Sequence, residues 1–168
     1  MANAWLMGKL WKPMRPFTRL VIPEVLRDAM IAHAQAALPN ECCGLLAGRI
    51  VEGTAFAEMR FAIRNDAASP KEYFTNPRDL LDAMKAARAA KLDVLALYHS
   101  HPTSAPIPSR RDLENNTWGE TAVHVIIGNV TTQPNVRAWW LGENEFHEVD
   151  VEIRTDSHHR IAPFRSNT

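Results

Sequence analysis

The expected order of strands and helices predicts a mixed α+β, or α/β, fold in which helices flank one central mixed β-sheet. The chain has 168 residues, which suits a single domain with a sizeable core. Short apolar segments of strand length alternate with two longer segments whose apolar residues recur with helical spacing. Two strands and later three strands follow one another directly, so the order differs from a regular parallel βαβ array.

The first third of the chain is expected to form a strand, a helix and a hairpin. Residues 18–22 have the composition of a strand, and Pro23 follows where the first turn of a helix tolerates proline. The apolar face of this helix is expected to hold Leu26, Met30, His33 and Ala37. The apolar residues 42–51 indicate a buried strand, and residues 54–63 indicate a second strand, joined to the first through the turn Glu52-Gly53.

The middle of the chain is expected to form a loop, a helix and a buried strand. Residues 65–73 are polar and indicate the loop. Asn76 should cap a helix that has Pro77 at its first position and ends near residue 90. The apolar stripe of this helix is expected to consist of Leu80, Leu81, Met84 and Ala87. The strand 92–99 has a continuous apolar centre, which indicates burial on both faces.

A short helix and three strands are expected to complete the domain. Ser109 should cap a helix that extends to about residue 118. Strands are expected at residues 121–127, 136–141 and 146–153. The adjacent tryptophans Trp139 and Trp140 must point to opposite faces of their strand, so one should lie in the core while the other can line a groove.

Three regions follow from this order: an N-terminal arm at residues 1–16, a domain at 17–153 and a polar tail at 154–168. The arm contains Trp5, Leu6, Leu10 and Trp11 but lacks the continuous apolar segment of a signal peptide. It could contact a lipid surface or a partner, and we favour the alternative that it packs on its own domain or frays. No apolar run is long enough to predict a membrane span.

Charge and cysteine content narrow the function classes. Lysine and arginine together number 19, as do aspartate and glutamate, so no overall field favours nucleic acid or an acidic membrane as a partner. Cys42 and Cys43 are adjacent and are the two cysteines of the chain, which indicates a reducing cytoplasm rather than a disulfide framework. Their apolar neighbours favour buried, inert thiols over redox-active groups or additional metal ligands.

The segment YHSHPTSAPIPSRRD, residues 98–112, contains two histidines, a serine and an aspartate that are candidates for a metal site. Side chains two apart on a strand point to the same face, so His99 and His101 can meet at one point in space. Two neutral imidazoles suit zinc, although two histidines at the surface end of a strand would give the same pattern.

Asp112 strengthens the interpretation of this segment as a metal site. It falls in the first turn of the helix that Ser109 caps, and the proline-rich arm 102–108 can fold that turn back toward the histidines. A carboxylate is a legitimate third zinc ligand, and three protein ligands leave a fourth position for water. The competing interpretation is a pair of capping residues at a helix N-terminus, and one carboxylate can serve both purposes.

Glu41 is the candidate general base, because it stands at the mouth of the apolar strand 42–51. Spacing alone favours a solvated strand end over a catalytic role for this residue. A catalytic role for Glu41 therefore needs evidence other than its spacing in the sequence.

The run HSHPTSAPIPSRRD resembles the motif of the JAMM metalloproteases: His-x-His-Pro, seven residues between the second histidine and serine, then Ser-x-x-Asp. That family also has an upstream glutamate in a Glu-x-Cys-Gly context, which Glu41-Cys42-Cys43-Gly44 matches. The resemblance covers roughly residues 17–153 and shows no departure from the motif. It implies a JAMM/MPN fold, a cytidine-deaminase-like sandwich with a central mixed sheet flanked by helices.

The resemblance also implies a role for each residue of the motif. His99, His101 and Asp112 would be the ligands of one zinc ion per chain. Glu41 would take the proton of a zinc-activated water as general base and later pass it to the leaving amine, and Ser109 would help to stabilise the tetrahedral oxyanion. The known chemistry of zinc agrees with this mechanism, because a hydrolysis of this kind needs no protein nucleophile.

The chain resembles small prokaryotic members of the family in its length and in the sequence segments YHSHP and SRRD. The implied function is that of a zinc metallopeptidase or isopeptidase, deubiquitinase-like, that cuts a peptide or isopeptide bond at the C-terminal Gly-Gly of a ubiquitin-like or sulfur-carrier protein. One branch releases cysteine from a sulfur carrier in cysteine biosynthesis, and another removes ubiquitin-like modifiers from lysines. The sequence leaves this choice open, together with the oligomeric state, for which a homodimer is one option.

Two alternatives remain at this point. A RadC-like protein of the same superfamily carries a similar motif and has been linked to DNA metabolism, but the balanced charge does not favour it. A non-catalytic MPN-type binding module is the second alternative, and such modules usually lack one or more of the ligands that are present here.

The segment SPKEY, residues 69–73, resembles a stretch of bacterial relatives that would border the substrate cleft.

Overall fold

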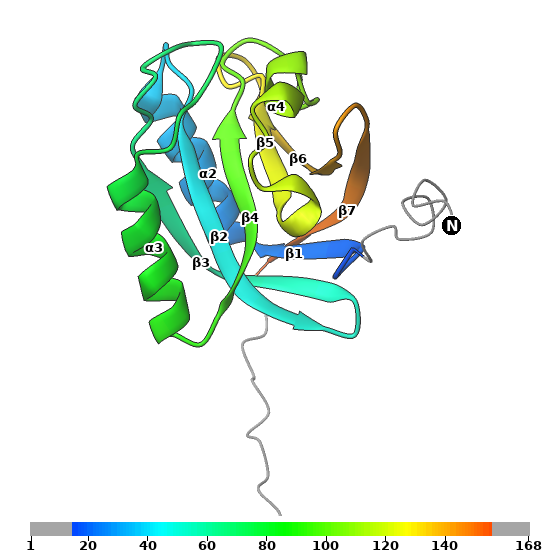
Figure 1. The fold of residues 1–168 in the computed structure, drawn as a ribbon. Coiled ribbons are helices and arrows are strands. Elements are labelled where there is room, and N and C mark those ends of the chain that lie inside the picture. Colours follow the sequence, from blue (N-terminus) through cyan, green and yellow to red (C-terminus); the bar gives the residue numbers. More distant parts are fainter. Residues whose placement is uncertain (1–14, 156–168) are drawn as a thin grey trace, which may run out of the picture.

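Seven strands and three α-helices make up the fold in a computed structural model that describes residues 15–155 (Figure 1). Residues 1–14 of the predicted arm and residues 156–168 of the predicted tail lie outside the described residues. The elements are β1 Arg19–Pro23, α2 Glu24–Ala37, β2 Cys43–Val51, β3 Thr54–Ile63, α3 Pro77–Ala89, β4 Asp93–Ser100, α4 Arg110–Glu114, the 3₁₀ turn η1 Gly119–Thr121, β5 Val123–Gly128, β6 Asn135–Leu141 and β7 Phe146–Arg154. The mixed α/β fold class is confirmed.

The strands form one mixed sheet in the order β1-β3-β2-β4-β5-β6-β7, which closes on itself. β1 closes it by pairing in parallel with β3 on one side and with β7 on the other. β4 and β5 are also parallel, and the remaining neighbours are antiparallel. The closure was not part of the prediction, because a five-residue strand gives no signal of having two distant partners.

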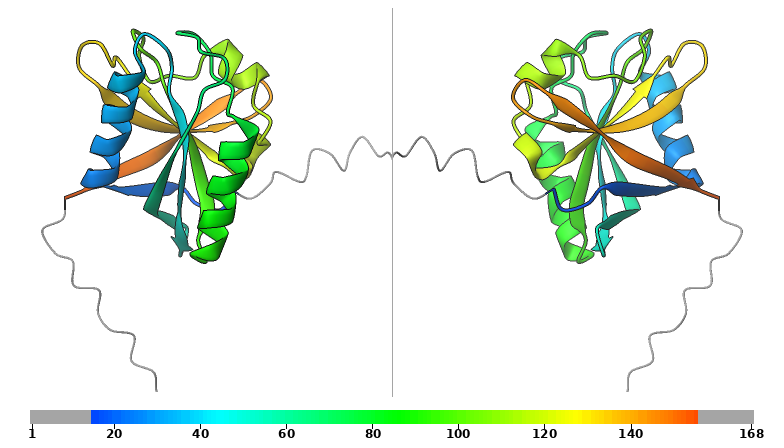
Figure 2. Two further views of the ribbon diagram at one scale, coloured as in Figure 1. Left: turned by 90° about the vertical axis from the view of Figure 1, so that its left-hand side faces the viewer. Right: turned by 90° about the vertical axis from the view of Figure 1, so that its right-hand side faces the viewer.

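Helices cover both faces of the sheet (Figure 2). On one face, Met30 and Ala34 of α2 pack in the main core with residues of β1, β2, β4 and β5. On the other face, Ala83 and Ala87 of α3 pack against β2. A smaller cluster joins Leu113 of α4 to β5 and β6. The face that carries α3 and α4 is also the face on which the side chain of His99 lies.

The apolar stripe predicted for α3 is wrong in part. Leu81 and Met84 are 51% and 38% exposed, whereas Ala83 and Ala87 are buried. Alanine lets the helix axis approach the sheet closely, so the helix turns its small residues inward and leaves two larger ones in solvent. Leu80 is partly buried against the same cluster, as predicted.

Local signals in the sequence set the other boundaries. Glu52 and Gly53 have φ angles of 48° and 75°, which a tight hairpin between twisted strands requires. The side chain of Asn76 accepts hydrogen bonds from the amides of Arg78 and Asp79, so the predicted cap of α3 is confirmed. The helix after Ser109 is shorter than predicted, because the Asn116 side chain accepts a hydrogen bond from the Trp118 amide and competes with helix continuation. Within residues 15–155, no helix is long and apolar enough to cross a membrane.

Candidate metal centre

The end of β4 fixes the two histidines of the motif on one face of the sheet. His99 is fully buried and His101 is 5% exposed. Ser100, between them, points to the opposite side, where its hydroxyl accepts a hydrogen bond of 2.8 Å from the Cys42 amide. The His101 amide donates to the Ile127 carbonyl at 2.8 Å, which keeps the chain extended one residue past the strand. The alternation predicted from the sequence is therefore present.

The arm 102–108 is held by contacts on both sides. Nδ1 of His101 pairs with the Ala105 carbonyl at 3.0 Å, which fixes Nδ1–H as the donor and turns Nε2 toward the site. The indole of Trp139 donates to the Pro106 carbonyl at 2.8 Å. Gly128 admits this close approach, since a Cβ there would lie 2.3 Å from the Pro106 nitrogen. Trp139 is thus buried beneath the arm, and Trp140 lies in the main core.

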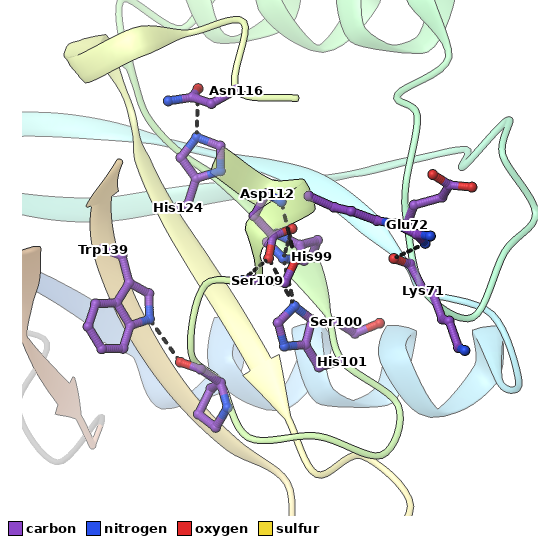
Figure 3. A network of polar contacts seen from close by, with 12 residues as sticks. Lys71, Glu72, His99, Ser100, His101, Ser109, Asp112, Asn116, His124 and Trp139 are labelled. Atoms are coloured by element: carbon purple, nitrogen blue, oxygen red, sulfur yellow. Dashed lines mark hydrogen bonds and ion pairs between the residues drawn. The ribbon is translucent and has the colours of Figure 1, made fainter. Parts of the chain in front are cut away.

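A capping box places Asp112 opposite the histidines (Figure 3). The Ser109 amide donates to Oδ2 of Asp112 at 2.6 Å, and the Asp112 amide donates to the Ser109 hydroxyl at 3.2 Å. The Asp112 side chain is 8% exposed. The short helix α4 therefore serves to hold one carboxylate at a defined place.

His99, His101 and Asp112 bring three ligand atoms together, and these atoms lie within 4.8 Å of one another. Nε2 of His99 is 3.2 Å from Nε2 of His101 and 3.2 Å from Oδ1 of Asp112, while Nε2 of His101 is 3.4 Å from Oδ2 of Asp112. Tetrahedral ligands at the usual zinc–nitrogen distance are separated by about 3.3 Å. The donor set and its spacing fit a zinc ion with one position left open.

Burial and mutual contacts set the protonation of the three side chains. Burial lowers the pKa of His99, against the opposing effect of the Asp112 carboxylate. Burial also disfavours the charged form of Asp112, but the neighbouring His99, His101 and Ser109 outweigh it and hold the pKa of that carboxyl well below its usual range. For His101, the hydrogen bonds to Asp112 and Ala105 outweigh burial and raise the pKa. A deprotonated carboxylate beside imidazoles is the state that binds a dication.

Glu41 lies beside the three ligand candidates. β2 and β4 pair Cys43 with His99, and continuing this antiparallel register places Glu41 opposite His101 on the same face. The side chain is 5% exposed, and Oε2 has no hydrogen-bond partner among the described residues. Burial raises the pKa of Glu41 to about 8, partly offset by the charge of His101. An unpartnered carboxyl oxygen next to a metal-ligand set is suited to hold and release a proton.

Two aromatic side chains that the sequence did not place beside His99 lie next to its ring. Tyr73 stacks on His99 with ring centres 4.6 Å apart, and His124 meets it edge to face at 6.5 Å. Tyr73 and His124 also line a pocket of about 430 Å³ together with Phe74, Leu97 and Trp118. Tyr73 belongs to the segment SPKEY, whose predicted place beside a cleft fits this position. Nothing in the sequence distinguished His124 from a core histidine.

The two cysteines and His33, which the sequence analysis also considered, have surroundings that fit a structural role. Cys42 and Cys43 are buried and free, and burial raises the pKa of their thiols to about 11 and about 12, as expected of inert cysteines. Nδ1 of His33 lies 2.9 Å from the Tyr98 hydroxyl, on the face of the sheet opposite the metal-ligand set, so its predicted structural role fits.

Three named proteins resemble the chain along most of its length. The desampylase of Haloferax volcanii is 32% identical over 144 residues, which are 81% of this chain and 97% of the relative. A probable TtuB-protein conjugate cleaving protease of Thermus thermophilus is 35% identical, over 75% of this chain and 78% of the relative. The CysO-cysteine peptidase of Mycobacterium tuberculosis is 34% identical, over 64% of this chain and 71% of the relative.

A solved structure and a family description agree with these relatives. The solution structure of a protein from Desulfitobacterium hafniense superimposes with a TM-score of 0.76 at 26% identity, over 84% of this chain and 97% of that one. Residues 23–142 match the family described as prokaryotic homologues of the JAB domain, and this range contains Glu41 and the whole His-x-His to Asp112 segment. The chain therefore belongs to the prokaryotic JAB domain family.

Proposed function

We propose that the protein is a zinc-dependent hydrolase that cuts the peptide or isopeptide bond following the C-terminal Gly-Gly tail of a ubiquitin-like or sulfur-carrier protein. The observation that carries this proposal is the set of three ligand atoms spaced at 3.2–3.4 Å beside the buried carboxyl of Glu41. The named relatives support the reaction class, because they are a desampylase, a conjugate-cleaving protease and a peptidase.

Each residue of the site has a distinct task in this proposal. Nε2 of His99, Nε2 of His101 and the Asp112 carboxylate hold the metal. Zinc bound there would lower the pKa of a coordinated water toward neutrality and polarise the scissile carbonyl. Glu41 accepts the proton of the attacking water on its unpartnered Oε2 and delivers it to the leaving amine.

Ser109 can donate to the developing oxyanion while it caps α4. Its oxygen accepts the Asp112 amide, and that contact leaves the hydroxyl proton free to donate. A donor aimed at the place where charge develops is worth more in a dry site than in water. The capping contact also limits the directions in which the hydroxyl can point.

The substrate tail is proposed to lie in the pocket between the segment 72–75 and the segment 114–118. Tyr73, Phe74 and Trp118 line this pocket together with Leu97 and His124. An extended tail of residues without side chains, which Gly-Gly provides, can lie close against these aromatic and apolar side chains. The names of the relatives point to a carrier conjugate or a carrier–cysteine adduct, the latter within cysteine biosynthesis, as the alternatives. A cytoplasmic location fits the two free, buried cysteines.

Three substrates prepared from one carrier protein test the proposal. They carry, after the Gly-Gly tail, a linear peptide, the ε-amine of a lysine peptide, or a single cysteine. The zinc-loaded protein should hydrolyse at least one of them, and Glu41→Gln should bind zinc normally while losing at least 100-fold in rate. Glu52→Gln makes the same change at an exposed glutamate of the turn between β2 and β3 and should retain most of the activity.

Three results would count against the proposal. Full activity of Glu41→Gln would rule out the assigned general base. Failure of the wild-type protein to bind zinc after reconstitution would favour the non-catalytic binding module. Binding to DNA that weakens steeply with salt would favour the RadC-like alternative.

A further inference from the structure

His124 lies next to the metal-ligand set, and the proposed reaction gives it no chemical step. It is on β5, which pairs in parallel with β4 and places His124 opposite Leu97, two residues before His99. The side chain is 2% exposed, and its ring meets the ring of His99 at an angle of 74°. Figure 3 shows His124 between Asn116 and the metal-ligand set. The ring nitrogens of a buried histidine normally have hydrogen-bond partners, so the partner of each nitrogen of His124 has to be identified.

The orientation of the Asn116 amide determines the first of these nitrogens. Nδ2 of Asn116 donates to the carbonyls of Gly119 and Leu141, each at 3.2 Å. Oδ1 of Asn116 accepts the Trp118 amide at 3.1 Å. These three backbone contacts fix which end of the amide is oxygen, and that oxygen lies 3.2 Å from Nε2 of His124.

Nε2 of His124 must therefore carry the proton, because its partner can only accept. In a neutral imidazole the other nitrogen, Nδ1, is then an acceptor with a free lone pair. The residue is 2% exposed, and burial favours the neutral form of an imidazole. Nδ1 of His124 is buried and has no partner among the described residues.

His99 presents the complementary group. Its Nε2 faces Asp112 and His101, so a metal would bind there and occupy the lone pair of Nε2. The proton of the neutral ring then resides on Nδ1, which becomes a donor. Nδ1 of His99 is likewise buried and without a partner in the part of the chain that the structure describes. The two unpartnered atoms, on neighbouring rings whose centres are 6.5 Å apart, are thus one donor and one acceptor.

We propose that His124 is a positioning residue that holds Nδ1–H of His99, through one bridging water molecule, when His99 binds the metal. The inference rests on the proposed metal centre. The ring centres are 6.5 Å apart, which is too far for the two nitrogens to touch, so one intervening water molecule that accepts from His99 and donates to His124 completes the contact. Asn116, anchored by three backbone groups, then holds His124 in the required tautomer. Partners of this kind orient a ligating histidine, and their loss typically weakens metal binding by about 10- to 100-fold.

Zinc affinity measured by competition with a chromophoric chelator tests the role of His124 without any substrate. His124→Phe preserves a buried ring and removes the acceptor, so it should weaken zinc binding by about 10- to 100-fold. His124→Gln restores an acceptor oxygen and should recover part of the affinity. His33→Phe makes the same change at a histidine on the opposite face of the sheet and should bind zinc like the wild type.

The wild-type protein offers a second readout that does not depend on how a variant folds. Nitrogen NMR of the zinc-loaded protein should show a slowly exchanging proton on Nδ1 of His99 and no proton on Nδ1 of His124. A protonated Nδ1 on His124, or unchanged zinc affinity in a folded His124→Phe protein, would overturn the inference and leave the proposed function intact. A wild-type protein that binds no zinc would overturn both.

Discussion

The Asp112 carboxylate accepts a 2.6 Å hydrogen bond from the Ser109 amide while its oxygens also lie 3.2 Å and 3.4 Å from the two histidine Nε2 atoms. One side chain thus caps a helix and faces the metal-ligand set. The two interpretations of Ser-x-x-Asp that the sequence left open are therefore compatible. A single geometry links the stability of α4 to the position of a metal ligand.

Substitutions at Ser109 should separate capping from catalysis. Ser109→Ala removes both the cap and the hydroxyl, so the free energy of unfolding should fall by about 1 kcal/mol and hydrolysis should slow. Ser109→Gly also removes the hydroxyl but costs only a few tenths of a kcal/mol as a cap, so it should slow hydrolysis with little loss of stability. Urea unfolding and steady-state rates measure the two effects. Equal rates for Ser109→Gly and the wild type would exclude the hydroxyl from the reaction.

Removal of the metal should lower the free energy of unfolding by an amount that depends on the ratio of free zinc to the dissociation constant. At free zinc 100-fold above the dissociation constant, the wild-type protein should gain about 2.7 kcal/mol over a chelator-treated sample. Asp112→Asn keeps an oxygen for the Ser109 amide but loses the charge, so most of the gain should disappear. Asp79→Asn, in the first turn of α3, is the matched control and should retain it. Thermal melting with and without zinc gives the comparison, and an undiminished gain in Asp112→Asn would contradict the ligand assignment.

The buried carboxyl of Glu41 should make the chelator-treated protein less stable as the pH rises. Burial raises its pKa from 4.5 to about 8, so between these values the unfolded chain has released a proton that the folded chain retains. Its contribution to stability is present below pH 4.5 and is lost as the pH rises through 8. Glu41→Gln cannot ionise, so its advantage over the wild type should grow across this window.

The size of this advantage follows from the pKa shift, since one unit corresponds to about 1.4 kcal/mol. We expect a few kcal/mol above pH 8 and none near pH 4, measured by urea unfolding in chelator. Glu52→Gln changes an exposed glutamate of the turn between β2 and β3 and should follow the wild-type curve. Parallel curves for Glu41→Gln and the wild type would show that Glu41 is not buried as the structure has it.

Gly128 should influence the metal site although it contacts no ligand. In Gly128→Ala the new Cβ would meet Pro106 at 2.3 Å and displace the arm whose Ala105 carbonyl orients His101. Overpacking of this kind costs about 1–3 kcal/mol, and zinc affinity should fall by about tenfold or more. Gly142→Ala, whose nearest neighbour would be 3.3 Å away, should change neither quantity much. Normal zinc affinity in Gly128→Ala would show that the arm adjusts without moving His101.

The sequence predicted the elements well where a local signal existed. Asn76 and Pro77 mark the start of α3 by capping chemistry, and Glu52-Gly53 marks the hairpin by its need for positive φ. The grouping of His99, His101 and Asp112 was also accessible, because strand alternation and a capping box both act over a few residues. Glu41 was found only through resemblance to a family, since nothing local distinguishes it from a solvated strand end.

Features that depend on tertiary contacts were missed. The inward face of α3 is decided by how closely the helix approaches β2, so Ala83 is buried where Met84 was expected. The proximity of His124 to His99 arises from the parallel pairing of β4 with β5, which a single sequence does not reveal. Tyr73 reaches His99 because the loop before α3 folds over the sheet, and only its membership of SPKEY hinted at this place.

The two parallel pairings of β1 also have a consequence for biosynthesis. β1 begins at Arg19, whereas its neighbour β7 ends at Arg154. β2, β3 and β4 can pair while the remainder of the chain is still being translated, but β1 gains its second neighbour only after almost the whole domain has left the ribosome. Pairings this distant in the chain form slowly, so the earliest strand to emerge is the last to be enclosed.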